Sequence, residues 1–172
     1  MKSKKFYTIP FVWDRRLWVM TFACFALWIG LSGWFIYQIF TTENDPALLG
    51  SLIVLNVVFL PTIIACEGLA PQRLEVSEQE ITVLCRFESV TILRSTILSI
   101  EPLSKKDMSW TINMGGCGGL FGYFGSFSNR HIGQFTMYAT QKQNLYLIKQ
   151  VGGKSVVISC SEPQYLIPEI KK

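Results

Sequence analysis

Two long runs without any ionisable side chain dominate the first third of the chain. Residues 17–40 and 47–66 contain no Asp, Glu, Lys, Arg or His. A bilayer core is about 30 Å thick, so a spanning helix needs about 20 apolar residues, and each run supplies them. Neither run shows the alternation of a strand or the polar face of a surface helix. The pattern therefore predicts two transmembrane helices.

The segment between the runs, residues 41–46, can turn the chain but is too short to cross a membrane. Asp45 suits a helix cap and Pro46 suits a first helical turn. We therefore expect residues 17–66 to form a hairpin of antiparallel helices. A cleaved signal peptide is excluded, because its apolar region spans only about 7–15 residues.

The pattern changes to period two after Pro71. Residues 73–77 and 81–88 alternate around the turn 77–80, which predicts a β-hairpin. Tight turns are expected at 141–144 and 152–153. A short final helix is expected to start at Ser161, and Pro168 limits it to one or two turns. Its Tyr165, Leu166 and Ile170 can face the sheets. Further strands are predicted at residues 90–92, 97–100, 109–114, 134–140, 145–150 and 155–160. This spacing is typical of a small sandwich or barrel.

The sequence Gly-Gly-Leu-Phe-Gly-Tyr-Phe-Gly-Ser-Phe at 118–127, followed by Ile-Gly-Gln-Phe-Thr-Met-Tyr-Ala-Thr at 132–140, resembles the bacterial pleckstrin-homology (PH)-like domains. The resemblance covers about residues 70 to 170. It implies a mainly-β domain of two packed antiparallel sheets with a C-terminal helix, in many members tethered behind two membrane spans. It implies little about activity, because fold does not determine function. The expected organisation is a basic N-terminus (1–16), the transmembrane hairpin (17–66) and a PH-like domain (70–172).

Charge predicts the orientation of the hairpin. The basic residues that precede the first run are Lys2, Lys4, Lys5, Arg15 and Arg16. The loop at 41–46 carries two acids and no base, so the positive-inside rule places both chain ends in the cytoplasm. The resemblance to bacterial domains implies that the anchor lies in the cell (inner) membrane. The net charge of +4 lies mostly in this segment. The C-terminal domain mixes both signs, which argues against nucleic-acid binding.

The chain offers few candidate reactive groups. Its five cysteines are scattered, without a CxxC pair, and its one histidine, His131, has no evident nucleophile or carboxylate partner. We therefore expect no catalytic site, no metal and no cofactor, with reduced thiols in the cytoplasm. The acidic first hairpin turn, Ser-Glu-Gln-Glu at 77–80, would repel phosphate, so phosphoinositide recognition there is disfavoured.

The glycine-rich segment 115–125 matches neither phosphate-binding pattern and contains no Lys or Arg, so nucleotide binding is disfavoured. Two interpretations stay open: a bulged connection whose aromatic side chains belong to the core, or an exposed loop that contacts the bilayer, the helix ends or a partner. The candidate contact residues are Leu120, Phe121, Tyr123, Phe124 and Arg130.

The predicted spans contain no ionisable residue, which argues against transport. Gly30, Gly33 and Asn56 are candidates for close helix packing, within the hairpin or between copies. Two functions follow. The first is a non-enzymatic, membrane-tethered interaction module that binds a protein partner or self-associates. The second is an accessory to a membrane lipid-modifying enzyme or transporter, which needs a polar cluster that the sequence does not display.

Overall fold

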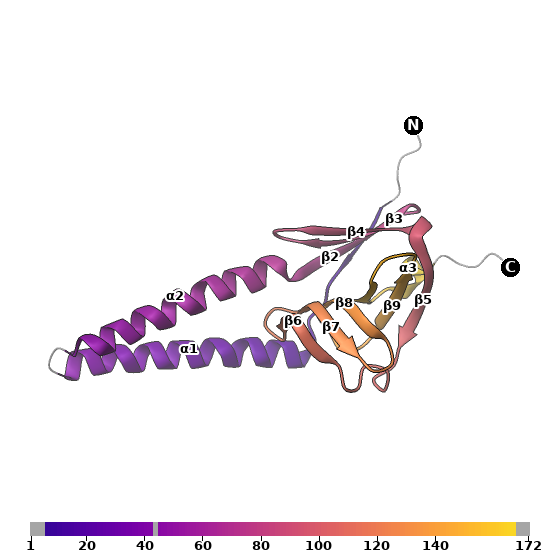
Figure 1. Ribbon diagram of the computed structural model, residues 1–172. Coiled ribbons are helices and arrows are strands. Elements are labelled where there is room, and N and C mark those ends of the chain that lie inside the picture. Colours follow the sequence, from indigo (N-terminus) through magenta and orange to yellow (C-terminus); the bar gives the residue numbers. More distant parts are fainter. Residues whose placement is uncertain (1–5, 43–44, 168–172) are drawn as a thin grey trace.

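The computed structural model describes residues 6–42 and 45–167 and has two long helices that leave one side of a β domain (Figure 1). Helix α1 spans Arg15–Thr41 and helix α2 spans Pro46–Leu69. Asp14 caps the N-terminus of α1. Asp45 caps α2 and Pro46 occupies its first turn, as predicted. Only 6% and 0% of their most apolar windows are buried by the rest of the chain. Both helices are therefore candidate membrane spans rather than core helices.

Aromatic rings pack between the two helices. The Trp28 ring stacks on Phe59 of α2 at 5.2 Å, and Phe25 meets Phe59 edge-on at 6.5 Å. This contact accounts for a tryptophan in the middle of a span.

A four-stranded antiparallel sheet covers one side of the domain, in the order β1-β2-β3-β4. Strand β1 (Tyr7–Pro10) precedes the hairpin in sequence, whereas β2 (Pro71–Val76), β3 (Glu80–Cys85) and β4 (Ser89–Leu93) follow it. Sequence analysis predicted no strand in the N-terminal segment. Tyr7 nevertheless pairs with Val76, so the segments before α1 and after α2 lie on the same side of the hairpin.

The second sheet has six strands, in the order β5-β9-β10-β8-β7-β6. A 3₁₀ turn (Arg94–Thr96) leads into it. The strands are β5 (Ile97–Leu103), β6 (Ile112–Gly118), β7 (Tyr123–Asn129), β8 (Gly133–Ala139), β9 (Leu145–Gln150) and β10 (Ser155–Ser159). All pairs are antiparallel except β8 and β10. The expected antiparallel arrangement is therefore corrected at this pair, because β10 inserts between β8 and β9.

The two sheets pack face to face over a shared core. Buried side chains of the four-stranded sheet, including Leu74 and Val83, meet Phe124, Ile148 and Ile158 of the six-stranded sheet. Helix α3 (Pro163–Leu166) closes this core with Leu166, as predicted. The predictions that concern Lys2, Lys4, Lys5, Pro168 and Ile170 lie outside the described residues. Two packed sheets with a short C-terminal helix confirm the predicted fold class.

The glycine-rich segment forms most of a β-hairpin, with a short turn between β6 and β7. Gly116 and Gly125 face each other across the two strands, and both have positive φ angles (142° and 109°). A Cβ at Gly116 would collide with the Phe124 carbonyl oxygen. Only glycine therefore permits this close approach of two backbones.

Candidate binding site between helix and sheet

A pocket of about 1080 Å³ lies where the first turns of α1 meet the outer face of the six-stranded sheet. Its floor is apolar and comes from neighbouring strands: Tyr123 and Phe127 of β7, Met137 of β8 and Leu145 of β9. These side chains belong to a second buried cluster, on the face of the sheet opposite the main core. One wall is α1 itself, through Val19 and Met20. The pocket is therefore shared by the β domain and a candidate membrane span.

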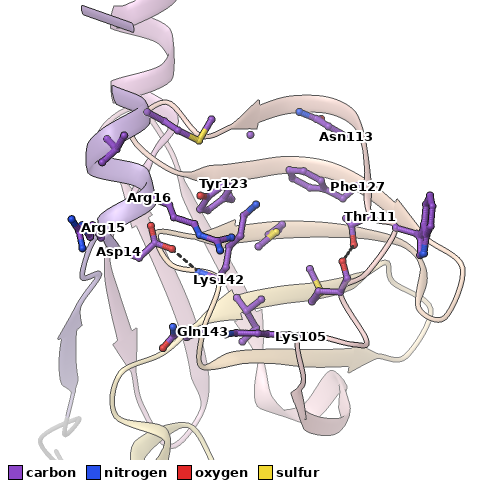
Figure 2. Close-up of a pocket in the computed structure, with 17 residues that line it drawn as sticks. Asp14, Arg15, Arg16, Lys105, Thr111, Asn113, Tyr123, Phe127, Lys142 and Gln143 are labelled. Atoms are coloured by element: carbon purple, nitrogen blue, oxygen red, sulfur yellow. Dashed lines mark hydrogen bonds between the residues drawn. The ribbon is translucent and has the colours of Figure 1, made fainter. Parts of the chain in front are cut away.

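Asp14 attaches α1 to the sheet beside this pocket (Figure 2). Its Oδ1 accepts a hydrogen bond from Leu17 N at 2.7 Å, which caps the helix. Its Oδ2 accepts one from Lys142 N at 3.1 Å, and its own N–H donates to Thr140 O at 3.1 Å. Thr140 is completely buried, and its hydroxyl donates to Val12 O at 2.8 Å. The start of α1 and the β8–β9 connection are thus joined by three hydrogen bonds, which involve Asp14 and Thr140.

Four basic side chains line the pocket: Arg15, Arg16, Lys105 and Lys142. Asp14 is the one acidic residue among the described lining residues, and both of its carboxylate oxygens already accept hydrogen bonds. Figure 2 shows Arg16 and Lys142 close together over the sheet beside Tyr123. An anion in the pocket would therefore face an excess of positive charge.

Tyr123 is 3% exposed, and within the described part of the chain its hydroxyl makes no hydrogen bond. The Lys142 ammonium lies 4.9 Å from the centre of its ring, a cation–π contact. Burial, followed by the nearby Asp14 carboxylate, raises the pKa of the phenol. The hydroxyl therefore stays protonated at neutral pH and is an available hydrogen-bond donor.

The other candidate contact residues are distributed around this junction. Phe121 packs on α1: its N–H donates to Thr21 Oγ1 at 3.4 Å, and its ring lies 6.0 Å from Trp13 and 6.2 Å from Phe25. Leu120 is partly buried beside it and accepts from the Cys117 thiol through its carbonyl oxygen.

Phe124 and Arg130 point away from this contact. Phe124 is buried between the two sheets, on the face of β7 opposite Tyr123. Arg130 is exposed in the β7–β8 turn and does not line the pocket. The aromatic residues of the glycine-rich segment thus divide among the main core, the pocket floor and the helix contact.

Helix α2 is attached to the domain separately. The ring of Phe87 packs against Gly68, where a Cβ would collide with it, and Phe87 N–H donates to Gly68 O at 2.9 Å. Arg86 and Glu67 form an ion pair at 2.9 Å. Both helix bases are therefore held by the β domain.

The candidate packing residues of the spans make few contacts. A Cβ at Gly30 or Gly33 would meet nothing within 4 Å in the described chain, and the Asn56 side chain donates to Leu52 O of its own helix at 2.9 Å. Packing between copies through these residues stays a prediction.

The arrangement is suited to binding. Among residues 6–42 and 45–167, no group of three His, Cys, Asp or Glu side chains could hold a metal ion. The described contacts of His131 include a backbone N–H bond to Asn129 Oδ1 at 2.7 Å, which belongs to a turn. The features present are an apolar floor, a basic rim and one unused phenol donor.

Sequence reasoning missed this pocket because its lining comes from segments far apart in the chain. Asp14 precedes α1 and Arg16 lies in its first turn, whereas Tyr123 lies in the glycine-rich segment and Lys142 follows β8. One signal was visible: an Asp directly before a long apolar helix is a typical N-cap.

A family model described as a bacterial PH domain matches residues 72–172. The match begins within β2 and includes β3 to β10 and α3. No curated protein and no solved structure matched the chain.

Proposed function

The chain belongs to the bacterial PH domain family, and from this premise we propose that it is a non-enzymatic interaction module held at a membrane by its helical hairpin and facing the cytoplasm. PH domains are generally interaction modules without catalytic activity. The observation that carries the proposal is the attachment of both helix bases to the domain, at Asp14 and at Gly68. A domain attached in this way has a fixed orientation relative to the bilayer.

The orientation of the sheet supports this function. Strand β6 is the edge next to α1, since a Cβ at Gly119, directly after this strand, would collide with the Met20 side chain. Trp110, Ile112 and Met114, in and before β6, are 85%, 64% and 60% exposed. Exposed apolar and Trp side chains beside a membrane span are suited to the bilayer interface. Figure 1 shows β6 beside the base of α1, and in this proposal the β6 edge faces the bilayer.

Self-pairing of strands at the β6 edge is disfavoured by its local structure. Asn113 uses its side chain to donate to Gly116 O at 3.0 Å and to accept from Gly115 N at 3.0 Å. The strand has a register shift at the same place. A bulge and local side-chain bonds are common protection against edge-to-edge pairing.

The opposite edge, β5, is the surface we propose for a protein partner or a second copy. It pairs with β9 on one side, and no other described strand pairs with it. Leu98 of β5 is 67% exposed, and Leu93 and Val151 in adjoining segments are 51% and 63% exposed. Val151 N–H donates to Thr96 O at 2.9 Å, which brings these segments together. Because β5 has its own register shift between Ile97 and Ser99, the contact that we propose forms through these exposed apolar side chains rather than by strand addition.

The charge distribution supports the cytoplasmic orientation. Arg15 and Arg16 begin α1, and the loop between the helices carries Glu43 and Asp45. Basic residues favour the cytoplasmic flank of a span. The pairing of β1 with β2 supports a β domain that lies wholly on the side of this flank, which is the cytoplasmic side in this proposal.

Photo-crosslinking in living cells tests the proposal with the full-length protein. A crosslinking amino acid at Leu98 is expected to capture a protein, and differently tagged copies reveal whether it is a second copy. The control position is Thr82, on the outer face of the four-stranded sheet, where its hydroxyl pairs with Thr91 at 3.2 Å. In a second variant the crosslinking amino acid is at Val151. Adding Leu98→Lys to the same chain should abolish capture without releasing the protein from the membrane. Equal capture at Leu98 and Thr82, or none at either, would contradict the assignment of β5.

A further inference from the structure

The pocket beside α1 combines features that suit one class of ligand. We infer that it binds an anionic phospholipid, with the headgroup among Arg16, Lys142 and the Tyr123 hydroxyl and the acyl chains leaving along Val19 and Met20 of α1. This site goes beyond the proposed function, although it rests on α1 lying in a bilayer.

Charge selects the headgroup. Within residues 6–42 and 45–167, no carboxylate forms an ion pair with any of the four basic lining residues, Arg15, Arg16, Lys105 and Lys142. Lys142 instead contacts the Tyr123 ring. The single lining carboxylate, Asp14, is occupied by two backbone N–H groups. Basic side chains next to a membrane surface attract anionic headgroups. Arg also offers paired donors that match phosphate oxygens.

The apolar surfaces select a lipid over a soluble phosphate. Phe127, Met137 and Leu145 form the floor, and Val19 and Met20 continue from it along α1 in the direction of the span. A free phosphate would leave these surfaces in contact with water, whereas the glycerol and first acyl carbons of a lipid would cover them. A volume of about 1080 Å³ is at the upper end of ordinary ligand pockets, which is large enough for both parts.

Tyr123 provides an independent indication. A buried hydroxyl without a partner is uncommon in folded proteins and calls for an explanation. Here the residue lines the pocket, between Asp14 and Arg16 on α1 and Lys142 on the sheet side (Figure 2). Its phenol can donate to a headgroup oxygen once the flexible Lys142 side chain moves off the ring.

The site differs from the first hairpin turn, where phosphoinositide binding was disfavoured. That turn carries Glu78 and Glu80, and the nearby Arg94 already donates to Ser77 O at 2.8 Å. The pocket lies on the other sheet, on the face turned away from the inter-sheet core.

Lipid titration of the purified full chain in neutral detergent, read by native mass spectrometry, tests the inference. The probes are dioctanoyl-phosphatidylglycerol, dioctanoyl-phosphatidylcholine and glycerol 3-phosphate. The double variant R16Q/K142Q should lower phosphatidylglycerol affinity about tenfold and leave the phosphatidylcholine affinity unchanged. K142Q preserves the backbone N–H that binds Asp14, so the junction stays intact. The matched control R130Q/K154Q removes the same charge outside the pocket and should have no effect.

Tyr123→Phe removes only the unpartnered hydroxyl. It should weaken phosphatidylglycerol binding about fivefold without lowering the melting temperature, because no described hydrogen bond is lost. Equal affinity for the two lipids, an equal loss in the control variant, or glycerol 3-phosphate binding as tightly as the lipid would each overturn the inference. Tighter binding of an acidic peptide than of phosphatidylglycerol would overturn it as well. None of these results depends on crosslinking at Leu98, so failure of this site and failure of the proposed function are distinguishable.

Discussion

Replacement of Asp14 by Ala is predicted to loosen the attachment of α1 to the β domain. The change removes the N-cap bond to Leu17, which is worth about 1 kcal/mol. It also removes the bond from Lys142 N to Oδ2, worth about 1 kcal/mol more. The bond from Asp14 N to Thr140 O does not need the side chain. The total predicted loss is therefore about 2 kcal/mol of unfolding free energy.

The matched control is Asp45→Ala. Asp45 caps α2 through Ala47 N at 2.9 Å, and its described hydrogen bonds involve neighbours in its own turn and none in the β domain. It should cost the cap of α2, about 1 kcal/mol, without affecting the unfolding of the domain. Asp14→Asn keeps an oxygen acceptor at the cap and should recover about half of the loss.

Thermal unfolding of the full-length protein in neutral detergent, followed by near-ultraviolet circular dichroism, measures this effect. A loss of about 2 kcal/mol in a domain of this size lowers the melting temperature by about 10 °C. The result that refutes the reasoning is a melting temperature within about 2 °C of the unmodified protein, or an equal decrease for Asp45→Ala.

Three further predictions concern the β domain. Burial, followed by the charge of Glu88, raises the pKa of Cys85 from 9.0 to about 11. Iodoacetamide at pH 8 should therefore label this thiol about 100-fold more slowly in the folded chain than in the urea-unfolded chain, and the difference should close above pH 11. Equal labelling rates at pH 8 would contradict this prediction. Gly125→Ala should cost about 3 kcal/mol in chemical denaturation, because its Cβ would lie 2.7 Å from the Gly116 backbone at a φ of 109°; an unchanged midpoint would refute the close approach. Arg94→Lys should cost about 2 kcal/mol in the same assay. The Arg94 guanidinium donates to three carbonyl oxygens at 2.8–3.2 Å, and a single ammonium cannot reach all three. A loss equal to that of Arg130→Lys would contradict this prediction.

Hydropathy alone was sufficient to predict the hairpin, since a bilayer requires long apolar runs and Asp45-Pro46 marks the second start. Most strands followed from alternation. Strand β7 did not, because Tyr123 and Phe124 are buried on opposite faces and leave no polar position between them. The glycines next to it also reduced the strand signal, although they are what lets β6 and β7 approach.

The pairing order of strands and the pocket required the structure. Tyr7–Pro10 is a short segment before a membrane span, and its pairing with β2 across the whole hairpin is a long-range contact that local propensity does not encode. The parallel contact of β10 with β8 is of the same kind. The pocket follows from both, since Arg16 and Lys142 meet only after the domain has closed around the base of α1.

The most direct test of the account is the side of the membrane on which the β domain lies. A reporter pair, one active only in the cytoplasm and one only outside it, is fused after Lys172 of the full chain, and in a second pair within the loop at residues 42–45. The account predicts a cytoplasmic signal after Lys172 and an external signal in the loop, with all fusions in the membrane fraction. An external signal after Lys172, or the same side for both positions, would contradict it.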